Sequence, residues 1–199
     1  MSKMSTNSSG HLRALEEAIQ KNEVLMELLK RLSELNLPDC YVASGGIAQT
    51  VWNRLHRFEP GFGIKDYDVI YYDKSDPSRE REAAALSKAT RIFKNLPVPV
   101  EVVNEANVHL WFEKEFGDPM PRPYASIEDA IGTFSTTAVC IGVRYNNGVF
   151  DVCAPYGLDD LFGLLLRRNG KFYTEKRHQE KIDRWTSLWP RLKVIPWDE

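Results

Sequence analysis

Helical and extended apolar patterns alternate along the chain, and their order restricts the folds that it can adopt. Apolar residues recur at helical spacing in 12–35, 47–58, 77–95, a short segment opening at Ser126, 158–168 and 173–189. Extended patterns cover 41–43, 67–72, 98–103, 137–145 and 149–154. Strands that alternate with helices and end in a hairpin predict an α+β (mixed α/β) domain around one small sheet flanked by helices.

The clearest hairpin signal is the Asn-Asn-Gly sequence between the last two extended segments. A two-residue turn at Asn146-Asn147 would place Cys140 and Cys153 opposite each other. A disulfide between them is left open as the alternative to two packed free thiols, which we favour because free cysteine behaves as a small apolar residue.

Composition excludes several classes of protein. Hydrophobic residues make up 43% and aromatic residues 11% of the 199 residues, which argues against a disordered chain. The net charge of -2 gives no overall basic surface for nucleic acid. No segment approaches the roughly 20 apolar residues of a membrane-spanning helix, so we expect no membrane partner.

The polar, serine-rich residues 1–10 are predicted to be a disordered tail. Residues 11–199 are expected to form one domain, because no long linker divides the chain. Within it we expect a core over about 37–155 and a C-terminal helical part over about 156–199. The three cysteines fit a reduced cytoplasmic protein better than a disulfide scaffold, and they never cluster with histidine at zinc spacing.

A glycine turn, Ser44-Gly45-Gly46, joins the first predicted strand to a helix. Glycines let backbone N–H groups approach a phosphate, and a helix N-terminus adds partial positive charge. The same turn also serves to connect a strand to a helix without binding anything, which is the commoner use of such a sequence. By itself the turn therefore indicates a phosphate contact only weakly.

Two acids, Asp66 and Asp68, lie at the start of an apolar strand. Residues i and i+2 of a strand point to the same side, so these carboxylates repel each other unless a cation lies between them. Magnesium suits such a pair, because it takes one or two carboxylates together with substrate phosphates. The alternative is a strand end whose acids simply face solvent. Acids beside a strongly apolar run depart from the local hydrophobic pattern, however, and such departures are common at functional sites.

A third acid, Glu101, lies within the apolar run Val100–Val103. If this strand lies beside the strand of Asp66 and Asp68, the three acids converge. Otherwise Glu101 lies on the solvent-exposed face of a strand whose other face is buried. Three carboxylates around one or two metals can align an attacking oxygen with an α-phosphorus and stabilise the leaving pyrophosphate. In that arrangement Glu101 completes the site and takes the proton of the acceptor.

These motifs together resemble the polymerase-beta-type nucleotidyltransferases, and more narrowly a bacterial and fungal family described simply as nucleotidyltransferase family proteins. The matching stretches are Ala43–Leu55, Ile64–Asp73, Val100–Trp111, Thr137–Arg144 and Ala154–Phe162. The resemblance implies transfer of a nucleoside monophosphate from a nucleoside triphosphate such as ATP, with release of pyrophosphate. It also implies Mg²⁺ or Mn²⁺ as the cofactor.

The resemblance assigns catalysis and metal binding to Asp66, Asp68 and Glu101, and nucleotide binding to the Ser44-Gly45-Gly46 turn. It leaves the acceptor open, as a small molecule, a protein or an RNA.

The chain departs from the family at two positions where members often carry arginine, which are Ala48 and Asn107 here. Arginine grips phosphate in a bidentate manner, so its loss would weaken triphosphate binding. These departures motivate an alternative, a catalytically weak relative that regulates by binding a nucleotide or a partner. A further alternative, an enzyme that modifies nucleic acid, is disfavoured by the acidic pI of about 6.1.

Overall fold

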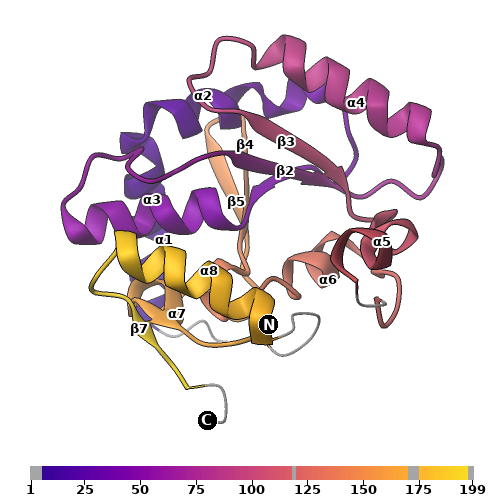
Figure 1. Ribbon diagram of the computed structural model, residues 1–199. Helices are drawn as coiled ribbons and strands as arrows, with labels where there is room; N and C mark the ends of the chain where they lie inside the picture. Colours follow the sequence, from indigo (N-terminus) through magenta and orange to yellow (C-terminus); the bar gives the residue numbers. More distant parts are fainter. Residues whose placement is uncertain (1–5, 118–119, 170–174, 197–199) are drawn as a thin grey trace.

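The computed structural model describes residues 6–117, 120–169 and 175–196 (Figure 1). Five strands form one sheet in the order β3-β2-β1-β4-β5. The strands are β1 Tyr41–Ala43, β2 Tyr67–Tyr71, β3 Val100–Asn104, β4 Gly142–Asn146 and β5 Val149–Cys153. Strands β2 and β3 are parallel and the other neighbours are antiparallel, so the sheet is mixed. The predicted α+β (mixed α/β) fold class is confirmed.

Helices flank this sheet on both faces (Figure 1). The α-helices are α1 Thr6–Lys21, α2 Glu23–Arg31, α3 Gly45–His56, α4 Arg79–Ile92, α5 Phe112–Phe116, α6 Ile127–Ile131, α7 Asp159–Phe162 and α8 Glu175–Leu188. Short 3-10 helices are η1 Leu32–Leu35, η2 Val108–Leu110 and η3 Thr137–Val139. Two further short strands, β6 Leu165–Leu166 and β7 Lys193–Val194, pair in parallel.

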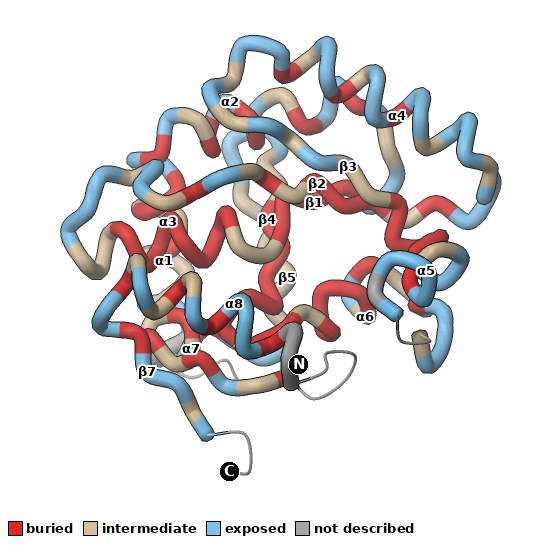
Figure 2. The backbone as a smooth tube through the Cα atoms, in the orientation of Figure 1, coloured by how far each residue is buried: buried red, intermediate tan, exposed pale blue. Residues whose placement is uncertain are grey.

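The two faces of the sheet differ, because successive strand residues point to opposite sides. Val69 and Tyr71 of β2 belong to the main core, which also contains buried residues of α1 to α4 and of the C-terminal segment. Ile70 belongs to a smaller cluster with Ile131 of α6 on the other face. Figure 2 shows the central strands β1 and β2 largely buried and the outer side of α4 exposed. Asp68 shares the face of Ile70, so it points away from the main core.

The N-terminal helix begins earlier than the sequence predicted. Helix α1 starts at Thr6, within the segment 1–10 that was expected to be a disordered tail; residues 1–5 lie outside the described part. Leu15 and Ile19 are fully buried, and their packing supports a helix that extends outward through the polar residues before them. The helical pattern over 12–35 is divided at Asn22, whose side chain caps a separate helix α2.

The hairpin forms with a register that differs from the expected one. Its turn consists of Asn147 and Gly148, both at positive φ, and Asn146 pairs with Val149. Two residues at positive φ are what a type I′ turn requires, and Asn-Gly satisfies this better than Asn-Asn. The register therefore moves by two residues, so that Cys153 lies opposite Gly142 rather than Cys140, and neither cysteine forms a disulfide.

The segment predicted as one helix over 158–168 is divided in the structure. Helix α7 ends at Phe162, Leu164 takes a left-handed backbone (φ 58°), and Leu165–Leu166 pairs with Lys193–Val194. The strand partner is remote in the sequence, so the local apolar pattern could not reveal it. None of the helices in the described ranges is long and apolar enough to cross a membrane.

Candidate active site

The predicted phosphate turn connects β1 directly to α3. Ser44 has φ 59° and ψ -132°, an uncommon backbone for a residue with a side chain, and its N–H donates to the Ile141 carbonyl at 2.9 Å. A Cβ atom on Gly46 would lie 2.5 Å from Cδ1 of Tyr67 and 3.5 Å from the Asp66 carbonyl oxygen. Gly46 thus lets α3 pack closely against the start of β2, where the two acids stand.

Strand pairing places the acids side by side. In the register of the sheet, Asp68 lies between Ala43 of β1 and Glu101 of β3. Directly paired residues of neighbouring strands carry their side chains on the same face, so the carboxylates of Asp68 and Glu101 are neighbours. Ser44 follows Ala43 in the chain and lies at the same end of β1. Asp66 precedes β2 by one residue and adds a further negative charge close to Asp68.

These residues open into a pocket of about 280 Å³ on the face of the sheet that α6 partly covers. Ser44, Asp68 and Glu101 form one end of its wall, and Lys181 of α8 contributes a positive charge. Asp66, Gly45 and Gly46 are not part of this wall. The other end is mostly apolar and aromatic, with Ile70, Val103, Val108, Trp111, Phe112, Tyr124 and Phe134. The pocket therefore joins a charged end to an apolar end.

The carboxyl group of Asp68 is held in an unfavourable electrostatic environment. Burial raises its pKa to about 6, with repulsion from Asp66 and Glu101 acting in the same direction and Lys181 opposing them. A carboxylate that is costly to ionise in the empty protein gains when a cation binds beside it. The charged end of the pocket thus favours the binding of a cation.

A divalent metal fits this end of the pocket when it is bound together with a substrate. Among the residues that the structure describes, no three His, Cys, Asp or Glu side chains form a group that could hold a metal ion alone. Magnesium, however, usually takes one or two protein carboxylates, with waters and substrate phosphates as its other ligands. Asp66 and Asp68 supply such a pair, and a cation between them would relieve the repulsion that raises the pKa of Asp68.

The sequence reasoning missed one acid of the pocket. Glu105 follows β3, is only 6% exposed and lines the same pocket as Asp68 and Glu101. Burial raises the pKa of its carboxyl to about 8, and repulsion from Asp68 contributes to the rise. The signal was present in the i+4 spacing from Glu101 along an extended segment, which puts both side chains on one face.

The two positions that lack a family arginine lie away from this pocket. Ala48 is fully buried in the main core. Asn107 is also buried, and its side-chain amide donates to the Glu82 carboxylate of α4 at 2.8 Å. Neither residue is part of the pocket wall.

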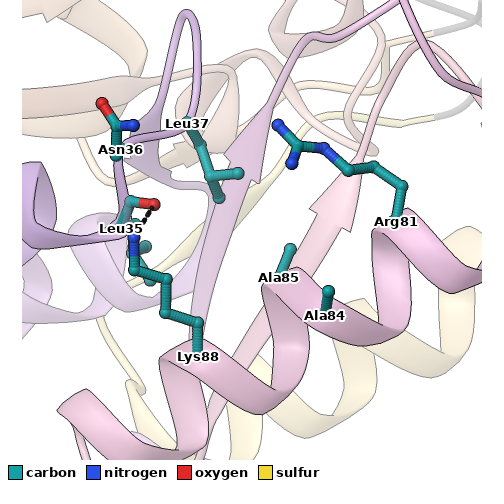
Figure 3. Close-up of a pocket in the computed structure, with 7 residues that line it drawn as sticks. All are labelled: Leu35, Asn36, Leu37, Arg81, Ala84, Ala85 and Lys88. Atoms are coloured by element: carbon teal, nitrogen blue, oxygen red, sulfur yellow. Dashed lines mark hydrogen bonds between the residues drawn. The ribbon is translucent and has the colours of Figure 1, made fainter.

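A second hollow lies between the end of η1 and helix α4, next to the opposite face of β2 (Figure 3). It measures about 150 Å³ and contains Leu35, Leu37 and Ala85 with two basic residues, Arg81 and Lys88. Lys88 donates to the Leu35 carbonyl at 2.9 Å. The hollow contains none of the acids described above, so we do not connect it with their chemistry.

Comparison with known proteins gives a family and a fold. A family model described as nucleotidyltransferase matches residues 30–194. A solved NMR structure described as revealing a CCA-adding enzyme head domain superposes with a TM-score of 0.72 at 24% sequence identity. That match covers 91% of this chain and 94% of the other, and at this identity it shows a shared fold. No curated protein matches the chain significantly.

Proposed function

The chain belongs to the nucleotidyltransferase family, as its motifs predicted. From this premise we propose that it is a metal-dependent enzyme. It would move a nucleoside monophosphate from a nucleoside triphosphate to an acceptor and release pyrophosphate. The observation that carries the proposal is the register of the sheet. It puts Asp68 beside Glu101 at the end of β1, where Ser44 begins the turn into α3.

We assign the triphosphate to the N-terminal end of α3. The backbone N–H groups of Gly45 and Gly46, with the Ser44 side chain before them, lie at the start of a 12-residue helix whose N-terminus is partly positive. Lys181 brings a full positive charge to the same end of the pocket. These groups would bind and orient the phosphates, so that the α-phosphorus lies near the acids.

The carboxylates would hold the metal and prepare the acceptor. Asp66 and Asp68 would be ligands of Mg²⁺ or Mn²⁺, and Glu101 would complete the site. When bound, the metal would neutralise charge that develops on the phosphate oxygens. Glu101 is exposed and adjacent to Asp68, so it can accept the proton of an acceptor hydroxyl that enters the pocket.

The alternative is a catalytically weak relative that regulates by binding a nucleotide or a partner, and turnover of the nucleotide separates the two proposals. The alternative rests on Ala48 and Asn107, where relatives often have arginine. Ala48 is enclosed in the core and Asn107 is bonded to Glu82, so neither position borders the pocket in this chain. The acids remain grouped on one face, as a phosphate-transfer site needs.

Isotope transfer tests this proposal even while the acceptor is unidentified. The purified protein is incubated with Mg²⁺ and ATP labelled at either the α- or the γ-phosphorus, with pools of small molecules, proteins or RNA as acceptors. Nucleotidyl transfer moves the α label to an acceptor and releases the γ label as pyrophosphate. Asp68→Asn should reduce transfer by a factor on the order of a thousand, as expected when a main transition-state contact is lost.

The matched control is Asp76→Asn, at an exposed acid whose turn-forming hydrogen bond to the Ser78 N–H asparagine can keep. It should transfer label at the wild-type rate. Transfer of the γ label, or equal activity of Asp68→Asn and the wild type, would contradict the proposal.

We also propose a cytoplasmic protein in which residues 11–199 act as one domain. None of its three cysteines forms a disulfide, which suits a reducing compartment. The main core contains residues from Leu15 to Leu192, so the sheet and the C-terminal part share one hydrophobic cluster.

A further inference from the structure

Glu105 is a buried acid with no partner. Its side chain is 6% exposed and lines the pocket, yet within the described part of the chain its carboxyl makes no hydrogen bond and no ion pair. A buried carboxyl without partners costs free energy, and native proteins rarely keep one without a reason. The partner that would satisfy it has to enter from the pocket.

The backbone holds Glu105 firmly in place. Its N–H donates to the Tyr71 carbonyl at 2.8 Å, so the pairing of β3 with β2 continues to this residue. The side chain of the preceding Asn104 accepts from the N–H of Asp73 and donates to its carbonyl, at 3.0 and 2.9 Å. Glu105 is therefore a fixed group on the pocket wall rather than a surface acid that happens to fold inward.

The surroundings of Glu105 favour a cation. Asp68 and Glu101 line the same pocket, and Lys181 is its one basic side chain among the described residues. Aromatic side chains also line the pocket, and their π faces attract positive charge. The nearby hydroxyl of Thr133 is already bonded to the Ala130 carbonyl and to the Tyr124 hydroxyl, so it does not compete for the ligand.

An organic cation fits this end better than a metal. A hard metal ion requires about six oxygen ligands, whereas the wall around Glu105 is mainly apolar and aromatic. An ammonium group needs only one carboxylate and can rest against aromatic rings. Nucleoside triphosphates carry no such cation, so the ligand at Glu105 belongs to the other substrate.

We propose that Glu105 is a specificity-determining residue that binds the protonated amine of a small-molecule acceptor, in the pocket that Asp68 and Glu101 also line. The proposal rests on the proposed function, because it names the class of acceptor for that site. The pocket volume of about 280 Å³ suits a small molecule or one end of it.

A pair of probes that differ only in charge tests the amine site. Benzylammonium and benzyl alcohol have nearly the same size, and each is titrated into the protein at constant ionic strength by calorimetry or ligand-observed NMR. A charge-assisted hydrogen bond should make benzylammonium bind about ten- to a hundredfold more tightly than the alcohol. Equal binding of the two probes to the wild type overturns the proposal.

Variants assign the preference to Glu105. Glu105→Gln keeps the size of the side chain but removes its charge, and it should erase the preference for benzylammonium. Glu105→Asp keeps the charge and should retain part of the preference. The matched control is Glu113→Gln, at an exposed acid of α5 outside the pocket wall, which should behave as the wild type. A preference that survives Glu105→Gln overturns the proposal.

Binding of each nucleoside triphosphate to the wild type with Mg²⁺ is measured in parallel. Nucleotide binding without an amine preference removes the amine site and leaves the nucleotidyltransferase proposal standing. An amine preference without any nucleotide binding removes the proposed function instead, together with the assignment of the amine to an acceptor. The two failures are thus distinguishable.

Discussion

At the scale of single residues, the pocket contains carboxyl groups that lower the free energy of unfolding when no ligand is bound. Burial raises the pKa of both Asp68 and Glu105; repulsion from Asp66 and Glu101 adds to the shift at Asp68, and repulsion from Asp68 adds to the shift at Glu105. Such groups lower stability while they await a ligand, and this is the pattern expected when a site is shaped for binding. Their removal should therefore harm function and help folding.

Glu105→Gln tests this trade-off in the ligand-free protein. The folded pKa of about 8 lies above the ordinary value of 4.5, so the wild type loses stability as pH rises from about 5 to about 8. Glutamine does not titrate, so the variant should gain on the order of 3 kcal/mol over the wild type at pH 8 and little at pH 5. Urea unfolding at several pH values measures the difference.

Asp68, whose pKa is also raised, to about 6, contributes to the same curve, and other titratable or charged groups surround Glu105. Asp68 and Glu101 face the pocket from β2 and β3, Tyr124 from the segment before α6, and Lys181 from α8. A gain that does not depend on pH would mean that the carboxyl of Glu105 is not the titrating group.

At Gly46, close packing explains why the residue is glycine. A side chain there would meet the ring of Tyr67, whose hydroxyl receives a hydrogen bond from Asn22 at 2.9 Å and so cannot easily move. Gly46→Ala should lower the free energy of unfolding by about 1–3 kcal/mol, the usual cost of overpacking. Gly10→Ala is the control, because that helical position is open and alanine should be neutral or slightly stabilising. Equal thermal stability of both variants would contradict this account of the turn.

At the scale of elements, one buried side chain joins three of them. Asn22 caps α2 by accepting from the Leu25 N–H at 3.1 Å. Its amide also donates to Thr50 of α3 and to Tyr67 of β2, each at 2.9 Å. Asn22, at the break between α1 and α2, therefore also fixes both helices to α3 and to β2, the strand that contains Asp68.

Asn22→Ala should cost about 2–4 kcal/mol, since a cap is lost and buried partners are left unsatisfied. Ser78→Ala removes the cap of α4 on the surface, where the Ser78 hydroxyl accepts from the Arg81 N–H, and should cost only about 1 kcal/mol. Chemical denaturation compares the two. Similar losses would show that the contacts of Asn22 to Thr50 and Tyr67 add nothing.

The elements also show what the sequence can and cannot predict. The five strands of the main sheet and the long helices α3, α4 and α8 were predictable in outline, because their apolar periodicity is local, although Thr137–Val139, expected as strand, forms the 3-10 helix η3. The turn at Asn147-Gly148 was misplaced by one residue, since the expectation centred on Asn-Asn rather than on the Asn-Gly pair that the backbone geometry prefers. The short strand Leu165–Leu166 was mistaken for helix because its partner is remote in sequence.

At the scale of the whole molecule, one face of the sheet stabilises the fold and the other faces the pocket. The C-terminal segment is attached to the core face: the indole N–H of Trp189 donates to the Asn53 side chain at 2.7 Å, and its ring packs edgewise on Trp52. This attachment positions α8, which carries Lys181 to the pocket. The acids of the candidate site were predictable from motif spacing, and the i+4 spacing of Glu105 from Glu101 was a local signal of the same kind, whereas Lys181 was not predictable, because only the assembled fold brings it to that wall.

Thermal unfolding with nucleotides tests the central claim most directly, that Asp66 and Asp68 hold a divalent metal against a nucleoside triphosphate. Each triphosphate is added with and without Mg²⁺ or Mn²⁺, to the wild type, to Asp66→Asn/Asp68→Asn and to the control Asp76→Asn. At about 100 times the Kd, binding should contribute about 2.7 kcal/mol and raise the Tm by about 5–10 °C. We predict a metal-dependent rise in the wild type and the control that is absent in the double variant. A rise that needs no metal, or that persists without both carboxylates, would contradict the claim.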